Sequence, residues 1–124
     1  MNNIAILYVE DDELNQTIIA ALLKTLGYIN IKLANSAAEA INILEKEKMD
    51  IILMDLGLPD ISGIELTKKI RDSEFAGKNA SIIAVTGNSE EKAKNACLAA
   101  GMNGFLSKPV DKEKLQFAIE NCLS

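Results

Sequence analysis

Side chains that suit metal and phosphate chemistry follow directly after four short apolar runs of this 124-residue sequence. They are Glu10 and Asp11 after the first run, Asp55 at the end of the second, Thr86 after the third and Lys108 after the fourth. Each has an ordinary structural explanation when it occurs alone, because acids and threonines often cap helices and lysines are usually solvated. Their repeated placement at the ends of apolar runs favours one shared site.

The chemistry of these residue types points to phosphoryl transfer. Three carboxylates in one partly desolvated cleft repel one another and raise one another's pKa values unless a cation is present. One lysine does not offset three acids, whereas Mg²⁺ prefers hard oxygen ligands and commonly completes its shell with water and phosphate. A hydroxyl and an ammonium suit the remaining phosphate oxygens, and a carboxylate can act as a nucleophile and form an aspartyl phosphate.

Composition excludes several other functions. The sequence has no histidine, which removes Ser/His and Cys/His catalytic arrangements, and two cysteines alone do not make a zinc site. Both Cys97 and Cys122 fall on apolar helix stripes, which favours core packing in a reducing, cytoplasmic location over a disulfide. The formal charge of −5 argues against nucleic-acid binding. The apolar runs are far shorter than the roughly 20 residues of a membrane span.

Apolar patterning predicts strands and helices that alternate along the whole chain. Continuous apolar runs predict strands at residues 4–9, 30–34, 50–55, 81–85 and 104–107. Apolar residues at three- and four-residue steps predict a helix after each strand, with stripes at residues 18–26, 37–44, 64–70, 93–100 and 115–122. The expected helix-end residues are the N-terminal caps Asp12, Ser36, Ser89 and Asp111, with Glu39 completing a capping box at Ser36, and the C-terminal glycines Gly27 and Gly101.

This alternation predicts a single α/β domain over residues 1–124. The expected architecture is a doubly wound, five-stranded parallel sheet with helices on both faces. Ligands of such sheets bind outside the carboxyl ends of the strands, where four of the five predicted strands deliver polar side chains. Asp12 is expected to serve only as a helix cap.

Four stretches resemble the response-regulator receiver domains of two-component signalling, over essentially the whole chain. They are residues 7–16 (LYVEDDELNQ), 54–63 (MDLGLPDISG), 84–87 (AVTG) and 104–109 (GFLSKP). The residues around Glu10, and Asn15 and Gln16, are most similar to those of receivers attached to hybrid sensor histidine kinases. The resemblance implies a (βα)5 flavodoxin-like fold and a phosphoacceptor domain of a phosphorelay, which is not a stand-alone kinase.

The resemblance also implies a role for each acidic residue. Asp55 would be the phosphoacceptor. Glu10 and Asp11 would hold Mg²⁺ together with Asp55 and the backbone carbonyl of Gly57. Glu10 stands where aspartate is more frequent, and its extra methylene would let it contact the metal through water.

The resemblance further implies which residues bind the phosphoryl group and which change conformation when it is bound. Thr86 would bind the phosphoryl group through its hydroxyl and Lys108 through its charge, with a cis peptide bond before Pro109. Movement of Thr86 would open space for Phe105, the switch aromatic, which lacks the hydroxyl of tyrosine and needs no polar partner. Gly57 and Asn88 would flank the path of an attacking water and so affect the lifetime of the phosphoryl group.

The implied partner is a histidine kinase or a histidine phosphotransfer protein, since this chain has neither a histidine nor an apparent nucleotide loop. Phosphorylation would then change the partner preference of the face built from the fourth helix, fifth strand and fifth helix. The domain is expected to be a monomer or weak dimer, without nucleic-acid binding or membrane insertion of its own. The sequence leaves open whether it works alone or within a longer protein.

Three other functions are consistent with parts of the pattern. The strongest is a phosphorylation-independent docking module with a receiver fold, although such modules tend to lose the acceptor, an acidic-pair member or the lysine. A phosphatase with an aspartyl phosphate intermediate usually has a second acid where this chain has Gly57. A flavodoxin-like electron carrier is disfavoured because the acidic residues Glu10 to Asp12 would repel a flavin phosphate.

Overall fold

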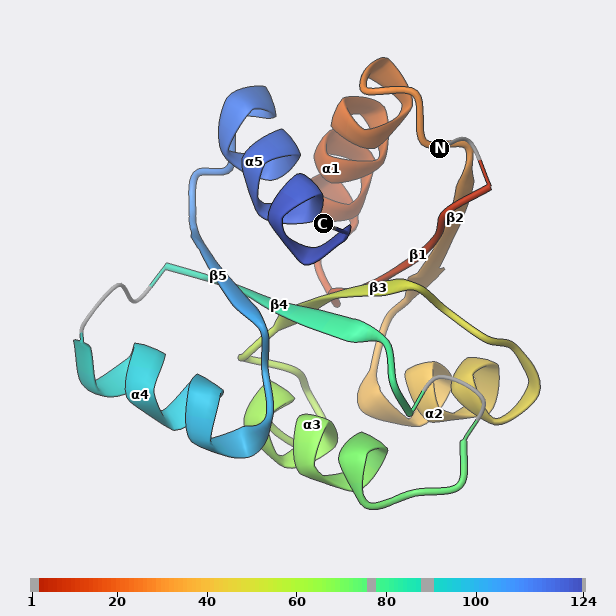
Figure 1. Cartoon of the computed structure of the whole chain (residues 1–124), viewed down its shortest axis with the longest axis vertical. Coiled ribbons are helices and arrows are strands. Elements are labelled where there is room, and N and C mark those ends of the chain that lie inside the picture. The colour runs from red at the N-terminus through yellow and green to blue at the C-terminus, as the bar shows by residue number, and fades with distance from the viewer. Residues whose placement is uncertain (1–2, 76–77, 88–90, 124) are drawn as a thin grey trace.

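The computed structural model describes residues 3–75, 78–87 and 91–123, and in these ranges five strands alternate with five helices (Figure 1). The strands are β1 (Ala5–Val9), β2 (Asn30–Ala34), β3 (Ile51–Asp55), β4 (Ser81–Thr86) and β5 (Gly104–Ser107). The helices are α1 (Glu13–Thr25), α2 (Ala37–Lys46), α3 (Gly63–Arg71), α4 (Glu91–Ala100) and α5 (Lys112–Leu123). Every predicted strand and helix is therefore present. The boundaries differ slightly, because Ile4 and Asp50 lie outside the strands and Thr86 lies inside β4.

The five strands form one parallel sheet in the order β2-β1-β3-β4-β5. Helices α1 and α5 cover one face of this sheet, and α2, α3 and α4 cover the other (Figure 1). The doubly wound parallel fold predicted from the sequence is thus confirmed. The connection after β1 runs to β2 on one side, and the connection after β3 runs to β4 on the other side. The carboxyl ends of β1 and β3 therefore flank the switch point where ligands bind in such sheets.

Two apolar clusters fill the space on the two sides of the sheet. Leu7 and Val9 of β1 pack in the cluster beneath α2, α3 and α4, whereas Ile6 and Tyr8 pack beneath α1 and α5. This alternation follows from the two-residue period of a strand. All five residues of β1 and of β3 are buried, which explains why these strands appear in the sequence as continuous apolar runs, with Asp55 as the polar residue that ends β3.

Side-chain caps fix the starts of three helices as predicted. Asp12 accepts a hydrogen bond from the N–H of Leu14 at the start of α1, and Asp111 accepts one from the N–H of Lys114 at the start of α5. Ser36 accepts from the N–H of Glu39 at the start of α2, 3.2 Å away. These bonds satisfy N–H groups that have no partner within the helix.

The predicted capping box at Ser36 is wrong in its second half. The Glu39 carboxylate accepts from the N–H of Asn35, one residue before the cap, at 2.9 Å, because its long side chain reaches past the cap residue. Gly27 and Gly101 follow α1 and α4 with φ values of 98° and 108°, as expected of glycines that end helices. Ser89, the expected cap of the fourth helix, lies outside the described residues.

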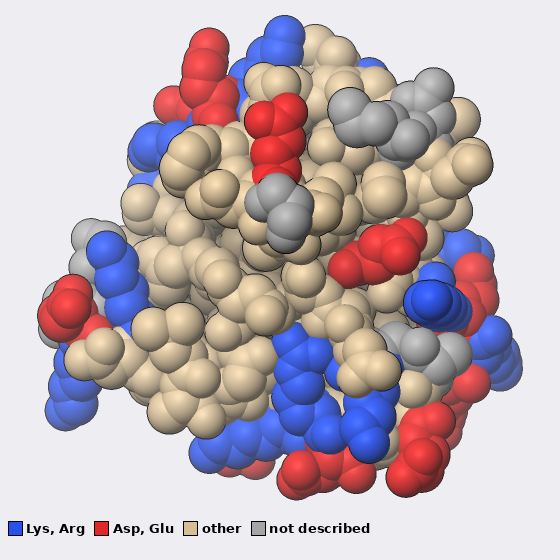
Figure 2. Space-filling model, viewed as in Figure 1, with Lys and Arg blue, Asp and Glu red and all other residues tan. Residues whose placement is uncertain are grey.

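The described surface carries charges of both signs, and the two cysteines are unpaired. Figure 2 shows acidic and basic side chains mixed around the margins of one face, with basic side chains gathered near α3. Cys97 is buried, Cys122 is half-buried, and neither forms a disulfide; burial raises the pKa of both thiols. None of the helices in the described ranges has the length and apolar content that a membrane span requires.

Candidate functional site

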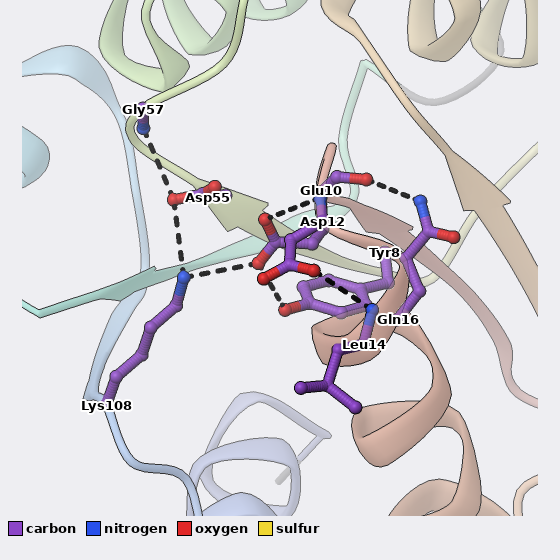
Figure 3. Close-up of polar contacts among 8 residues, drawn as sticks. All are labelled: Tyr8, Glu10, Asp12, Leu14, Gln16, Asp55, Gly57 and Lys108. Carbon is purple, nitrogen blue, oxygen red and sulfur yellow. Dashed lines mark hydrogen bonds and ion pairs between the residues drawn. The ribbon is translucent and has the colours of Figure 1, made fainter.

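The carboxyl ends of β1, β3, β4 and β5 bring the predicted site residues to one edge of the sheet. Glu10 follows β1, Asp55 and Thr86 are the last residues of β3 and β4, and Lys108 follows β5. The Lys108 side chain reaches across the edge toward Asp55 and Glu10 (Figure 3). Glu10, Asp55 and Thr86 are buried, with exposed fractions of 1%, 8% and 8%. Polar groups are rarely buried without a partner or a function, so this edge is the candidate site.

Three acids at this edge can reach a common ligand. Glu10, Asp11 and Asp55 each offer a carboxylate oxygen, and these three oxygens lie within 4.8 Å of one another. Glu10 and Asp55 are buried and Asp11 is exposed, so the cluster opens to solvent on one side. Hard oxygen donors with an open side fit Mg²⁺, which retains several water ligands. The residues present therefore fit the metal predicted from the sequence.

Lys108 bridges the two buried carboxylates. Its ammonium nitrogen lies 3.2 Å from Oε1 of Glu10 and 3.8 Å from Oδ1 of Asp55. Its backbone N–H donates to the carbonyl of Thr86 at 2.8 Å, which ties the segment after β5 to the end of β4. The peptide bond between Lys108 and Pro109 is cis, as predicted.

The loop that follows Asp55 is held at several points. The N–H of Gly57 donates to Oδ1 of Asp55 at 3.2 Å. Gly63 starts α3 so close to β3 that a Cβ atom there would lie 2.5 Å from the carbonyl oxygen of Asp55. Asp60 accepts from the N–H groups of Ala37 and Ala38 at the start of α2, at 3.0 and 2.9 Å. These bonds, the one from Ala37 most strongly, lower the pKa of the Asp60 carboxyl.

Glu10 is held by more contacts than the sequence indicated. The Tyr8 hydroxyl donates to its Oε1 at 2.8 Å, and the N–H of Asp12 donates to its Oε2 at 3.3 Å. The Gln16 amide donates to the Glu10 carbonyl at 2.5 Å and to Oδ1 of Asn35 at 2.8 Å. Both the carboxylate and the backbone of Glu10 are therefore fixed.

Sequence reasoning missed Tyr8 and Gln16 as parts of this site. Tyr8 was counted in the apolar run of the first strand. The signal that would have identified it is a hydroxyl two residues before an acid, because side chains two apart on a strand share a face. Gln16 is buried on α1 at 8% exposure, and an amide on the inner face of a helix requires a partner.

Thr86 and Phe105 lie on the same face of the sheet. Phe105 pairs with Ala84 in the register between β5 and β4, and Thr86 shares the face of Ala84 because it lies two residues further along β4. Phe105 packs, half-buried, against the cluster beneath α2, α3 and α4, and the Lys94 ammonium lies 5.5 Å from the centre of its ring. Asn88, the other residue predicted near Thr86, lies outside the described residues.

The family model of the response regulator receiver domain matches residues 6–120, from β1 into α5. The chain belongs to this family. As a receiver domain, it is not a stand-alone kinase. The family assignment made from the four sequence stretches is therefore confirmed.

Two solved receiver domains match this one closely in structure. The receiver domain of the sensor histidine kinase PA1611 from Pseudomonas aeruginosa, solved with a magnesium ion coordinated in its active site cleft, is 39% identical. The TM-score is 0.86, and the match covers 97% of this chain and 98% of that one. The second is a co-crystal structure of the Saccharomyces cerevisiae histidine phosphotransfer protein Ypd1 and the receiver domain of the response regulator Ssk1. It is 36% identical with a TM-score of 0.81, over 91% of this chain and 83% of that one.

Sensor kinases that contain receiver domains also appear among the sequence relatives. The CAI-1 autoinducer sensor kinase/phosphatase CqsS of Vibrio cholerae is 37% identical over 110 residues, which are 89% of this chain. Those residues are 16% of the length of CqsS, so this receiver domain corresponds to only one part of that relative. The resemblance to receivers of hybrid sensor kinases is thereby confirmed.

Proposed function

We propose that this receiver domain accepts a phosphoryl group from a phosphohistidine onto Asp55, in a Mg²⁺-dependent reaction. The observation that carries the proposal is the convergence of Glu10, Asp11 and Asp55, whose carboxylate oxygens lie within 4.8 Å of one another, with Lys108 beside them. A buried carboxylate with an adjacent ammonium at the ligand-binding edge of the sheet has the parts of a phosphoacceptor.

Glu10, Asp11, Asp55 and the backbone carbonyl of Gly57 would hold the metal. The hard oxygen donors of the acidic cluster and the magnesium ion of the similar PA1611 receiver domain support this set. When bound, Mg²⁺ supplies positive charge beside the phosphoryl group during its transfer.

The chain's own residues would carry the transfer itself. An oxygen of Asp55 attacks the phosphorus in line, the new O–P bond forms as the N–P bond to the donor imidazole breaks, and the imidazole nitrogen keeps the electron pair. Lys108 turns from Glu10 to the phosphoryl oxygens, and the Thr86 hydroxyl donates to one of them. Water attacking the same phosphorus later would return Asp55 to its free form, so the domain would catalyse both its phosphorylation and its dephosphorylation.

Phosphorylation would act on partners through Thr86 and Phe105. These side chains share one face of the sheet, and Lys94 of α4 lies over the Phe105 ring. Movement of Thr86 toward the phosphoryl group would shift the position of Phe105 and so the face formed by α4, β5 and α5. This is a population shift, biased only by the contacts that differ between the two states.

The donor protein is proposed to dock beside α1. Leu14 and Ile18 of α1 are 66% and 45% exposed next to the site, and at a four-residue spacing they lie on the same side of the helix. Ile18 also lines a groove of about 360 Å³ with Tyr8, Lys108 and Pro109. A histidine phosphotransfer protein or a histidine kinase is the proposed partner, and the complex of Ypd1 with the similar Ssk1 receiver domain supports it.

The wider context is also a proposal. Residues 1–124 would form one receiver domain that works in the cytoplasm as a monomer or weak dimer, without contacting nucleic acid or inserting into a membrane. The match of the family model to residues 6–120, the net charge of −5 and the two unpaired cysteines support this.

A nitrogen–phosphorus donor tests the proposed reaction without requiring the cognate partner. The domain is incubated with phosphoramidate, with Mg²⁺ or with EDTA, and its intact mass is measured. One added phosphoryl group with Mg²⁺ and none with EDTA is expected. No addition in either condition, with folding confirmed by circular dichroism, would favour the alternative of a phosphorylation-independent docking module.

A further inference from the structure

Tyr8 differs from the other residues of β1 because it carries a hydroxyl to the edge of the site. Its ring packs in the cluster beneath α1 and α5, with 1% of the residue exposed. Its hydroxyl donates to Oε1 of Glu10 at 2.8 Å, within the buried interior (Figure 3). A phenolic hydroxyl is protonated at neutral pH, so Tyr8 is the donor in this bond and the Glu10 carboxylate is the acceptor.

The two oxygens of Glu10 have different partners. Oε1 accepts from Tyr8 and lies 3.2 Å from the Lys108 ammonium, whereas Oε2 accepts only the 3.3 Å bond from the N–H of Asp12 among the contacts described. A bond of 3.3 Å is longer than the usual range of about 2.7–3.2 Å, so Oε2 is the less strongly held oxygen. Tyr8 thereby orients the carboxylate with Oε1 turned inward.

The Lys108 ammonium lies near both Glu10 and Asp55, whereas the Tyr8 hydroxyl donates to Glu10. The Lys108 side chain is 29% exposed and lies 3.8 Å from Asp55, so it can leave Glu10. The Tyr8 ring is locked in the core and its hydroxyl stays beside Glu10. When Lys108 turns to a phosphoryl group, Tyr8 is the donor that continues to satisfy the buried Oε1, which would otherwise lose a partner at high cost.

We propose that Tyr8 is a positioning residue of the metal site, whose hydroxyl fixes the Glu10 carboxylate so that Oε2 remains available to Mg²⁺ or to its water shell. This inference rests on the function proposed above. Groups that hydrogen-bond to metal ligands orient those ligands, and their loss weakens metal binding. An aspartate at position 10 would be one methylene, about 1.5 Å, shorter, so the 2.8 Å bond from the Tyr8 hydroxyl depends on the length of Glu10.

A purely structural role for the Tyr8 hydroxyl makes a different prediction. If the hydroxyl were only a satisfied polar group of the core, Tyr8→Phe would change stability and leave metal affinity unchanged. If it acts through Glu10, its effect on metal affinity must disappear when Glu10 no longer carries a carboxylate. A double-mutant cycle separates these two cases.

The experiment measures the Mg²⁺ dissociation constant by calorimetry for the wild type, Tyr8→Phe, Glu10→Gln and the double variant. Tyr8→Phe is expected to bind Mg²⁺ about 10-fold more weakly than the wild type. The same change in the Glu10→Gln background is expected to add less than twofold. Wild-type Mg²⁺ affinity in Tyr8→Phe, or an equal loss of affinity in both backgrounds, would overturn the inference about Tyr8. The proposed metal site would still stand in that case, provided that Glu10→Gln binds Mg²⁺ more weakly than the wild type. Unchanged Mg²⁺ affinity in Glu10→Gln would overturn both the inference and the proposed role of Glu10 in the metal site.

A spectroscopic measurement tests the same contact without altering Tyr8. The sequence has two tyrosines and no tryptophan, so tyrosine dominates the near-ultraviolet absorbance. Tyr28→Phe removes the other tyrosine, which packs in the same cluster and makes no contact described with Glu10. Mg²⁺ titration of Tyr28→Phe is expected to give a tyrosine difference spectrum that saturates with the calorimetric affinity. A flat difference spectrum at saturating Mg²⁺ would show that Tyr8 does not sense the metal site and would overturn the inference.

Discussion

The Lys108 ammonium lies 3.2 Å from Oε1 of Glu10, although the two residues are 98 positions apart in the sequence. The Glu10 side chain is 1% exposed and that of Lys108 is 29% exposed. The lysine therefore neutralises a carboxylate that water hardly reaches, and a long-range ion pair connects the start of α1 to the segment before α5.

Removing this charge should affect both stability and transfer. Lys108→Met keeps most of the apolar stem but leaves Glu10 without its cation, so the free energy of unfolding without added Mg²⁺ should fall by about 1–2 kcal/mol. This is less than for a fully buried pair because Lys108 is partly exposed. Phosphorylation of Asp55 should slow by about 100-fold, as for other lost charge-stabilising donors.

The matched control is a lysine in a solvated ion pair. Lys32 lies 2.9 Å from Glu47, with side-chain exposures of 42% and 44%. Urea unfolding of Lys32→Met should show a loss of less than about 1 kcal/mol and an unchanged phosphorylation rate. Equal losses in the two variants would contradict the assigned role of Lys108.

Gly63 should not tolerate a side chain. A Cβ atom there would lie 2.5 Å from the Asp55 carbonyl oxygen and 3.0 Å from Cα of Leu56, both backbone atoms that cannot easily move. Gly63→Ala should therefore destabilise the domain by about 1–3 kcal/mol and slow phosphorylation by displacing the end of β3. Gly57→Ala is the control for thermal unfolding, since a Cβ atom there would meet nothing within 4 Å. A Gly63→Ala variant as stable as Gly57→Ala would refute the close approach.

Asp60 gives a pH dependence whose sign follows from its lowered pKa. Its bonds to the N–H groups of Ala37 and Ala38 favour the carboxylate in the folded state, so the pKa is lower folded than unfolded. The resulting stability is present above the unfolded pKa of about 3.9 and is lost as pH falls through the lower folded value. Urea midpoints should therefore be lower for Asp60→Asn than for the wild type at pH 7, and the difference should shrink below about pH 4. A difference that is constant from pH 7 to pH 3 would contradict this account.

The docking surface on α1 can be separated from the chemistry at Asp55. Leu14→Ser and Ile18→Ser remove exposed apolar side chains beside the site, so each should slow transfer from a phosphorylated histidine phosphotransfer protein by about 10-fold. Phosphorylation by acetyl phosphate should be unchanged. Ile29→Ser, at 71% exposure beyond the other end of α1, is the control and should transfer like the wild type. Loss of both reactions in the α1 variants would indicate damage to the site instead of to docking.

The sequence predicted the layout of the site because the central strands are buried on both faces. Continuous apolar runs identified β1 and β3, and the polar residue that ends each run necessarily lies at the shared edge of a parallel sheet. The contact between Tyr8 and Glu10 was not predictable in this way, because a tyrosine in a core strand satisfies an apolar pattern whatever its hydroxyl contacts. The bond from Asn35 to Glu39 depends on how far the Glu39 side chain reaches past the cap residue. The Asp60 contacts to α2 depend on how the loop after β3 lies in space, which residue patterns along the chain do not encode.

Intact mass after incubation with acetyl phosphate tests the central claim most directly. The wild type, Asp55→Asn and Asp12→Asn are compared with and without Mg²⁺; asparagine is also a good helix cap, so Asp12→Asn controls for the loss of an acid near the site. The account predicts one added phosphoryl group on the wild type and on Asp12→Asn, only with Mg²⁺, and none on Asp55→Asn. Borohydride reduction followed by peptide mapping should then convert residue 55 to homoserine. An equal mass increase on Asp55→Asn would contradict the assignment of Asp55 as the phosphoacceptor.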